Sequence, residues 1–234
     1  MEKPDFTGLK ALFMNCTLKK SPRQSNTEGL MRVAMHIMKK NNIEVDYIRL
    51  VDHDVAFGMG KDMTEKGWDK DDWPALSKKV MDADILVIGT PIWEGDRSSV
   101  SKLLTERLDA MSGELNDKGQ SIYYGKTGGC LVTGNEDGYQ QCVRNILFSL
   151  ERLGFTNPPQ AGTGWVGAAG PGASYMDEEG GGKDSDFTQS TTTFMTWNLM
   201  HMAKLLKANG GFPAYGNQPE KWKEGKNFDH PNKP

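Results

Sequence analysis

The stretch from Asn15 to Thr27 combines the residue types that could bind an anion. It reads NCTLKKSPRQSNT, which is rich in hydroxyl and amide groups and includes three cations. An amphipathic pattern begins where it ends, so the free N–H groups of a helix N-terminus would follow directly. Such N–H groups, the positive end of a helix dipole and side-chain donors together favour an anion, most simply a phosphate monoester. An ordinary loop capped by Ser or Asn is the alternative.

A second stretch, Gly89 to Ser99, reads GTPIWEGDRSS. Pro91 fixes φ and removes a donor, Gly95 permits an unusual turn, and Trp93 offers a large flat surface. An aromatic side chain beside a ligand crevice suggests a planar ligand. A tryptophan that covers the core is the alternative.

A third stretch, Thr133 to Gly138, reads TGNEDG. Its small residues and polar backbone suit the edge of a heteroaromatic ring. The signal is weak alone and gains weight if the three stretches meet at one rim.

The elements around these stretches predict that they do meet. Apolar runs predict strands at residues 9–15, 43–50, 85–89, 129–133 and 163–166, and helical spacing predicts helices from residue 27, over 71–81, from 98 or 99, over 138–153 and over 187–208. Strands that alternate with helices in this way almost always form a parallel sheet with helices on both faces. The sequence therefore predicts a five-stranded doubly wound α/β fold. In that fold ligands bind beyond the carboxyl ends of the strands, where the strand order reverses.

Composition limits the classes of partner. The 28 Lys and Arg against 31 Asp and Glu give a net charge of −3, which argues against a nucleic-acid-binding surface. The longest aliphatic run, Ile85 to Ile88, is far below the ~18 residues of a membrane span, and no signal-peptide pattern is visible. A protein without a membrane segment is expected.

Cysteine and histidine usage points to an organic cofactor. Cys16, Cys130 and Cys142 form no C-x-x-C pair, and a reducing, cytoplasmic setting fits best. Four scattered histidines give no dedicated metal site. Any redox chemistry would therefore come from an organic group.

The sequence predicts one domain over residues 1–210 followed by an extended tail over 211–234. Loops 52–70 and 167–186 are further elaborations. The tail carries four aromatic residues and should lie along its own domain or a partner subunit. These long surface elements favour a homodimer or homotetramer.

Two literal motif matches lack the required context. GTGWVG at residues 162–167 runs through a predicted strand into AAGPG, which cannot start a helix, so a pyrophosphate site is not expected there. GKT at 125–127 precedes its strand and reads as a turn.

The three stretches NCTLKKSPRQSNTEGLM, GTPIWEGDRSSVSKLLTERLDAM and LVTGNEDGYQQC resemble the flavodoxin-like NAD(P)H-dependent FMN reductases, most closely the branch with the iron-sulfur flavoproteins. The resemblance covers roughly residues 8–210 and implies a flavodoxin-like fold, FMN as cofactor and NAD(P)H as co-substrate. It matches Thr17, Lys19, Ser25, Asn26 and Thr27 to the phosphate loop, and Pro91, Ile92, Trp93, Glu94, Gly95, Thr133, Gly134, Asn135, Glu136 and Gly138 to the loops around the isoalloxazine ring.

The sequence departs from that pattern in two places. Residues 51–73 contain no cysteine where the iron-sulfur branch carries its compact motif, so no cluster is expected. The first loop has additional residues around Leu18 to Lys20, which loosens its alignment.

The preferred function is an oxidoreductase that passes electrons from NAD(P)H through FMN to a small-molecule acceptor such as a quinone or a flavin. Because the cofactor performs the chemistry, no catalytic nucleophile or general base is expected. A flavodoxin-type electron carrier without its own substrate is the alternative. A phosphate-loop protein without flavin is a third possibility.

Overall fold

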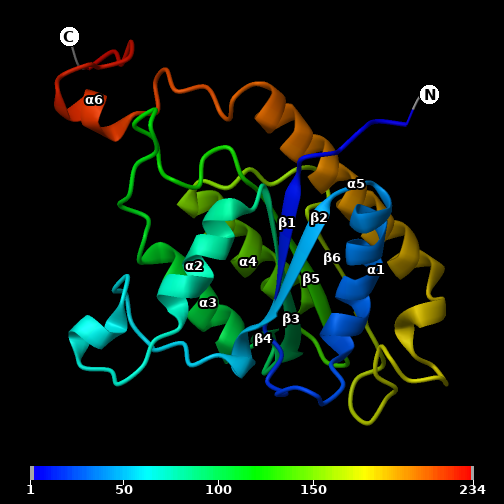
Figure 1. Ribbon diagram of the computed structural model, residues 1–234. Helices are drawn as coiled ribbons and strands as arrows, with labels where there is room; N and C mark the ends of the chain where they lie inside the picture. The colour runs from blue at the N-terminus through cyan, green and yellow to red at the C-terminus, as the bar shows by residue number, and fades with distance from the viewer. Residues whose placement is uncertain (1–2, 233–234) are drawn as a thin grey trace.

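A computed structural model describes residues 3–232, whose centre is a mostly parallel sheet (Figure 1). Its strands are β1 (Lys10–Asn15), β2 (Glu44–Arg49), β3 (Ile85–Trp93), β4 (Asp96–Arg97), β5 (Thr127–Gly134) and β6 (Gly162–Val166). The order is β2-β1-β3-β5-β6, and the short β4 pairs antiparallel with β3. The chain order reverses between β1 and β3, which confirms the predicted doubly wound α/β fold.

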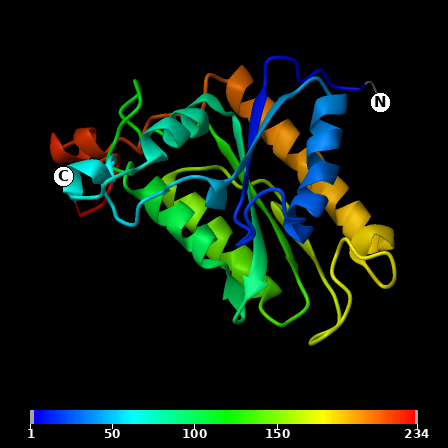
Figure 2. The same cartoon turned by 60° about the horizontal axis from the view of Figure 1, so that its bottom comes forward.

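Helices cover both faces of the sheet (Figures 1 and 2). One face carries α1 (Asn26–Lys40) and α5 (Asp186–Ala208), and the other carries α2 (Trp73–Asp82), α3 (Ser99–Asp109) and α4 (Tyr139–Leu153). Short helical segments lie outside these layers: η1 (Leu50–Asp52), η2 (Met63–Lys66), η3 (Gly182–Asp184) and α6 (Pro219–Lys223). The helices predicted from periodicity are thus all present.

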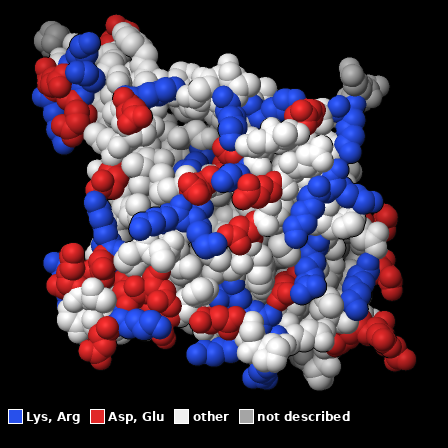
Figure 3. Space-filling model, in the orientation of Figure 1, with Lys and Arg blue, Asp and Glu red and all other residues white. Residues whose placement is uncertain are grey.

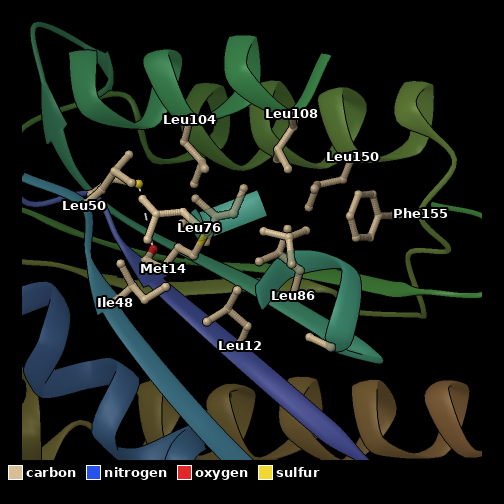
Figure 4. Close-up of a cluster of buried hydrophobic side chains, with 14 of the residues drawn as sticks. Leu12, Met14, Ile48, Leu50, Leu76, Leu86, Leu104, Leu108, Leu150 and Phe155 are labelled. Carbon is tan, nitrogen blue, oxygen red and sulfur yellow. Dashed lines mark hydrogen bonds between the residues drawn. The ribbon is translucent and has the colours of Figure 1, made fainter. Parts of the chain in front are cut away.

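Side-chain alternation along the strands divides the core in two. Leu12 and Met14 of β1 pack against α2, α3 and α4, together with Leu104 and Leu150 (Figure 4). Phe13, between them, packs on the α1 and α5 side. Each fully buried side chain of this kind contributes about 1.5–3 kcal/mol, so both layers hold the sheet rigidly.

Local signals start and stop the helices. Ser25 caps α1 by accepting a hydrogen bond from the Glu28 N–H at 3.2 Å, and Ser98 caps α3 in the same way. Proline stands in the first turn of α2, and Gly154, with φ of 113°, ends α4. Ser25 and Ser98 are thus the capping residues of α1 and α3.

Strand β3 is longer than its apolar run predicts, and this corrects the placement of Trp93. The run ends at Gly89, but β5 continues beside it and pairs Pro91 with Thr133, so β3 extends to Trp93. Trp93 then pairs with Asp96 across a two-residue turn. Trp93 is therefore the last residue of a strand and does not lie in a loop.

The tail returns to its own domain at the sheet edge opposite the carboxyl ends (Figure 1). Gln120 Nε2 donates to the Pro213 carbonyl at 3.0 Å, and the rings of Tyr124 and Phe212 meet edge to face at 5.7 Å. Tyr215, further along, is 80% exposed. The first part of the tail is thus anchored, far from the loops predicted to bind a ligand.

The surface carries mixed charge. Lys and Arg are interspersed with Asp and Glu on the face shown in Figure 3. Among residues 3–232, no helix combines the length and the apolar character needed to cross a bilayer.

Candidate functional site

The loops after β1, β3, β5 and β6 enclose a cavity of about 470 Å³ at the carboxyl ends of the strands, the edge turned forward in Figure 2. Most of the residues predicted for the site line it: Thr17, Lys19, Asn26, Thr27, Pro91, Ile92, Trp93, Thr133, Gly134, Asn135 and Glu136. Ser25, Glu94, Gly95 and Gly138 lie behind or beside the lining. The three stretches singled out in the sequence therefore do meet.

The start of α1 lies at one end of the cavity and carries groups that suit an anion. The backbone N–H groups of Asn26 and Thr27 have no acceptor among the described residues, as the geometry of a first helical turn requires. Lys19 reaches the same wall, and no described carboxylate lies within ion-pair distance of its ammonium group. Free donors, a helix dipole and an unpaired cation together suit a phosphate monoester.

Asn15, the last residue of β1, fixes the shape of the first loop. Its Oδ1 accepts from the Thr17 N–H at 3.0 Å, and its Nδ2 donates to Ser25 Oγ at 3.2 Å and to the Tyr47 hydroxyl at 2.9 Å. Ser25 is buried, and its oxygen is committed to Asn15 and to the helix cap. Ser25 thus shapes the loop from behind.

Arg49, the last residue of β2, supports the same loop from beneath. Its Nη1 donates to the carbonyls of Lys19 and Arg23, at 3.1 and 2.8 Å, and its Nη2 pairs with Glu28. Burial alone would raise the pKa of the Glu28 carboxyl, but hydrogen bonds from Arg32, Arg49 and Tyr47 outweigh it and hold that pKa below its usual value. The carboxylate therefore stays charged and keeps Arg49 in place.

The hairpin formed by β3 and β4 supplies an apolar wall. Ile92 is buried, whereas Trp93 is 53% exposed at the rim. A tryptophan covering the core would be buried, so the exposure of Trp93 excludes that alternative. Its indole is available to a flat ligand.

Two glycines bring this hairpin against the loop after β5. A Cβ added to Gly138 would lie 2.3 Å from the Gly95 carbonyl oxygen, and the two residues have φ of 120° and 73°. Thr27 and Thr133, which both line the cavity, are hydrogen-bonded to each other through their hydroxyls at 2.8 Å. Gly95 and Gly138 therefore shape the rim without lining the cavity.

Residues from the glycine-rich loop 167–186 and the strand before it complete the wall. The lining residues that the predicted site lacks are Leu18, Trp165, Gly170, Ser174 and Tyr175. The sequence marks the loop as an elaboration of the domain, but no motif points to its aromatic residues.

Two amide side chains fasten that loop over the cavity. Asn26 Oδ1 accepts from the Met176 N–H at 3.0 Å, and Asn135 Nδ2 donates to the Gly172 carbonyl at 2.9 Å. Asn26 and Asn135 were predicted as ligand contacts. In the structure, each side chain forms one hydrogen bond to the backbone of the loop.

The thiols cannot act as nucleophiles at neutral pH. Cys16, Cys130 and Cys142 are all free and buried, and desolvation raises the pKa of each, to about 12 for Cys16 and Cys142. No group of three or more candidate metal ligands occurs in the part of the chain that the structure describes. The site is thus a polar and aromatic binding cavity.

Comparisons with known proteins agree with this chemistry. The model of a family described as NADPH-dependent FMN reductase matches residues 10–165. The 8-demethyl-8-aminoriboflavin-5'-phosphate synthase of Streptomyces davaonensis is 39% identical over 205 residues, covering 85% of this chain and 79% of that protein. An iron-sulfur flavoprotein of Methanocaldococcus jannaschii is 24% identical over 196 residues, covering 82% and 96%.

The crystal structure of RosB with bound 8-demethyl-8-formylriboflavin-5'-phosphate has a TM-score of 0.83 and 36% identity, and the match covers 93% of this chain and 87% of that one. A divalent metal cation transporter of Mycobacterium bovis is 56% identical over 205 residues, which are 88% of this chain. The chain spans only 30% of that transporter's length, so the name describes a much longer protein.

Proposed function

The chain belongs to the family of NADPH-dependent FMN reductases, and from this premise we propose the acceptor and the residues that bind the cofactor. The protein is an FMN-dependent oxidoreductase that uses NAD(P)H. The acceptor is a small molecule such as a quinone or a free flavin. NAD(P)H and one proton supply the two electrons and two protons that such an acceptor takes up.

The observation that carries this proposal is the presence of an anion-binding end and a flat apolar wall in one cavity. The N–H groups at the start of α1 and Lys19 suit the phosphate of FMN, and Trp93 lies at the rim where a planar ring would reach. When bound, FMN accepts hydride from the nicotinamide and delivers electrons to the acceptor, so the protein needs no nucleophile of its own. The residues that line the cavity therefore fit FMN.

We assign the predicted residues to two roles. Phosphate contacts come from Thr17, Lys19, Asn26 and Thr27, and ring contacts from Pro91, Ile92, Trp93, Thr133, Gly134, Asn135 and Glu136. Ser25, Glu94, Gly95 and Gly138 hold these residues in place.

A flavin 5'-phosphate as the substrate is a second candidate. The 39% identity to 8-demethyl-8-aminoriboflavin-5'-phosphate synthase favours it, because the name of that relative describes the synthesis of a modified flavin 5'-phosphate. In that case the flavin recovered after turnover would differ in mass from FMN. An unchanged flavin mass would leave the reductase proposal.

A flavodoxin-type carrier is the contrasting function. A carrier would not oxidise NAD(P)H with a small molecule, since its electrons go to protein partners. The loop that closes this cavity, fastened by Asn26 and Asn135, supports a substrate pocket instead.

The test is an absorbance spectrum of the purified protein, heat release and chromatography of its flavin, and steady-state oxidation of NADH and NADPH. We expect FMN and turnover with a quinone or a flavin. A colourless protein, or FAD as the main species, would refute the cofactor assignment. Flavin without any turnover would favour the carrier.

We also propose a homodimer or homotetramer in a reducing, cytoplasmic setting. Phe187 and Phe194 on α5 are 74% and 51% exposed, which supports a further contact surface there, and the buried free thiols suit reducing conditions. Light scattering that shows a monomer at micromolar concentration would refute the oligomer.

A further inference from the structure

Trp165 and Tyr175 form a wall of the cavity that has no part in the assigned flavin contacts. They are 8% and 4% exposed, and both line the cavity. Their rings meet edge to face with centroids 6.0 Å apart. This wall joins the end of β6 to the loop that covers the cavity.

The Tyr175 hydroxyl has no hydrogen-bond partner in the described range 3–232, yet it is not among the polar atoms sealed from solvent. Tyr175 lines the cavity and so little of it is exposed elsewhere that its hydroxyl is a free polar group of this wall. Burial raises the pKa of the phenol, so the hydroxyl stays protonated at neutral pH and is a hydrogen-bond donor.

The ring that carries this hydroxyl is firmly placed. The Tyr175 carbonyl accepts from the Gly182 N–H at 3.0 Å, and the next residue, Met176, is fastened to Asn26. A Cβ added to Gly182 would lie 2.4 Å from Tyr175 Cδ2 and 2.6 Å from Trp165 Cδ1. The donor is therefore held in one position before any ligand binds, which lowers the entropy cost of using it.

The charged residues in the lining limit which kind of ligand could bind beside the Tyr175 hydroxyl. Among the described lining residues, only Lys19 and Glu136 carry a charge. Lys19 is assigned to the phosphate of FMN, so an electron acceptor that carries a phosphate would find no further cation in the lining. An uncharged, flat ring with a carbonyl oxygen needs only the aromatic walls and one donor.

We infer that Trp165 and Tyr175 form the subsite of the electron acceptor, which is an uncharged quinone, and that the Tyr175 hydroxyl donates a hydrogen bond to a quinone oxygen. The inference rests on the proposed function. As a quinone takes two electrons from NAD(P)H its oxygen becomes negative, and the hydrogen bond strengthens during the reaction. Tyr175 keeps its proton; the hydride carries one hydrogen and solvent supplies the second proton of the hydroquinone.

The test compares the holoenzyme with its Tyr175→Phe variant, which keeps the ring and removes the hydroxyl. With menadione as quinone, kcat/KM should fall about tenfold, as the loss of a hydrogen bond to a developing charge implies, with part of the fall in kcat. With ferricyanide, which takes electrons without such a contact, kcat/KM should stay unchanged. Tyr124→Phe, at the far end of β5, is the matched control and should match the wild type with both acceptors.

Binding provides a readout that is independent of turnover. Calorimetric titration of the oxidised holoenzyme with menadione should give about three- to tenfold weaker binding for Tyr175→Phe, while FMN affinity is unchanged. Gly182→Ala keeps the hydroxyl but displaces the ring, and should weaken menadione binding in the same direction.

The possible results distinguish a failure of the proposed function from a failure of the quinone subsite. If the wild type reduces neither acceptor with NAD(P)H, the proposed function fails and this inference falls with it. If the wild type reduces both but Tyr175→Phe reduces menadione equally well, only the quinone subsite is refuted. Equal losses with both acceptors, or weaker FMN binding, would show that Tyr175 serves the cofactor and would overturn the inference.

Discussion

Asn26, the first residue of α1, accepts a hydrogen bond through its side-chain oxygen from the backbone N–H of Met176, 3.0 Å away and 150 residues further along the chain. This bond joins the helix start that supplies the anion-binding N–H groups to the loop that covers the cavity. The backbone N–H of Asn26 stays free for a ligand. One residue therefore joins the proposed phosphate site to the loop that covers the cavity.

Asn26→Ala should speed the release of FMN about three- to tenfold, because one hydrogen bond that holds the covering loop, worth ~0.5–1.5 kcal/mol, is lost. The recovery of flavin fluorescence on dilution measures the rate. Asn198→Ala, which removes an amide bonded to the Pro159 carbonyl outside the cavity lining, is the control and should not change the release rate. Equal release rates for Asn26→Ala and the wild type would show that the loop does not retain the flavin.

Trp93→Ala should weaken FMN binding without lowering the melting temperature of the flavin-free protein. Its indole is 53% exposed, so little core packing is lost, whereas an aromatic contact with the flavin adds ~0.5–1.5 kcal/mol beyond area burial. Trp73→Ala is the contrast, because that indole is fully buried and its loss should cost ~3–5 kcal/mol of apo stability. A destabilised apo protein with normal FMN affinity after Trp93→Ala would contradict the assignment.

Acidification should lower the stability that the Glu28 carboxylate provides by pairing with Arg49, which holds the loop after β1. The folded-state pKa of this carboxyl lies below its unfolded value, so its contribution is present above the unfolded value of 4.5 and is lost as the pH falls through the folded-state pKa. Glu28→Gln should therefore be less stable than the wild type at neutral pH, by about 1–3 kcal/mol, because Arg49 loses its partner.

Denaturant melts from neutral pH down to about pH 3 provide the check, since the two proteins should converge as Glu28 becomes protonated. A constant gap over the whole range would mean that the charge of Glu28 contributes nothing.

Gly138 and Gly95 should respond differently to alanine. At Gly95 an added Cβ meets nothing within 4 Å, so Gly95→Ala should cost only the ~1–2 kcal/mol of a positive φ. At Gly138 the Cβ would strike the Gly95 backbone, which adds ~1–3 kcal/mol of overpacking and displaces the rim. Chemical denaturation together with FMN titration should show a loss of both stability and affinity for Gly138→Ala. Similar behaviour of the two variants would argue against the close contact.

Much of the fold is predictable from the sequence because its signals are local. Ser25, Pro74 and Gly154 mark helix ends through their own backbone chemistry, and the apolar runs mark strands. The end of β3 is not predictable in this way. Its extension past Gly89 depends on a neighbouring strand, and Pro91 in the middle of it reads as a break.

The residues of the candidate site also fall into those that local sequence signals predict and those that depend on the folded structure. Residues at or just beyond the end of a strand, such as Trp93 and Thr17, can be assigned to the rim from sequence because the parallel sheet places all such segments at one edge. Tyr175 could not, since its position depends on how a long glycine-rich loop folds back. Trp165 lies in the predicted strand 163–166 at the same edge, but no motif marks it as a lining residue. Ser25 is a case where the sequence predicts too much. Its hydroxyl lies in the predicted loop, but it accepts a hydrogen bond from the Glu28 N–H as the helix cap and does not line the cavity.

The most direct test of the account is an anaerobic titration of the purified protein with NADPH, followed by visible absorbance. We expect the yellow spectrum of bound FMN and its stoichiometric loss as NADPH is added. A flavin spectrum that NADPH leaves unchanged, while the flavin is still reduced by dithionite, would contradict the claim that this cavity is the site of an NADPH-dependent FMN oxidoreductase.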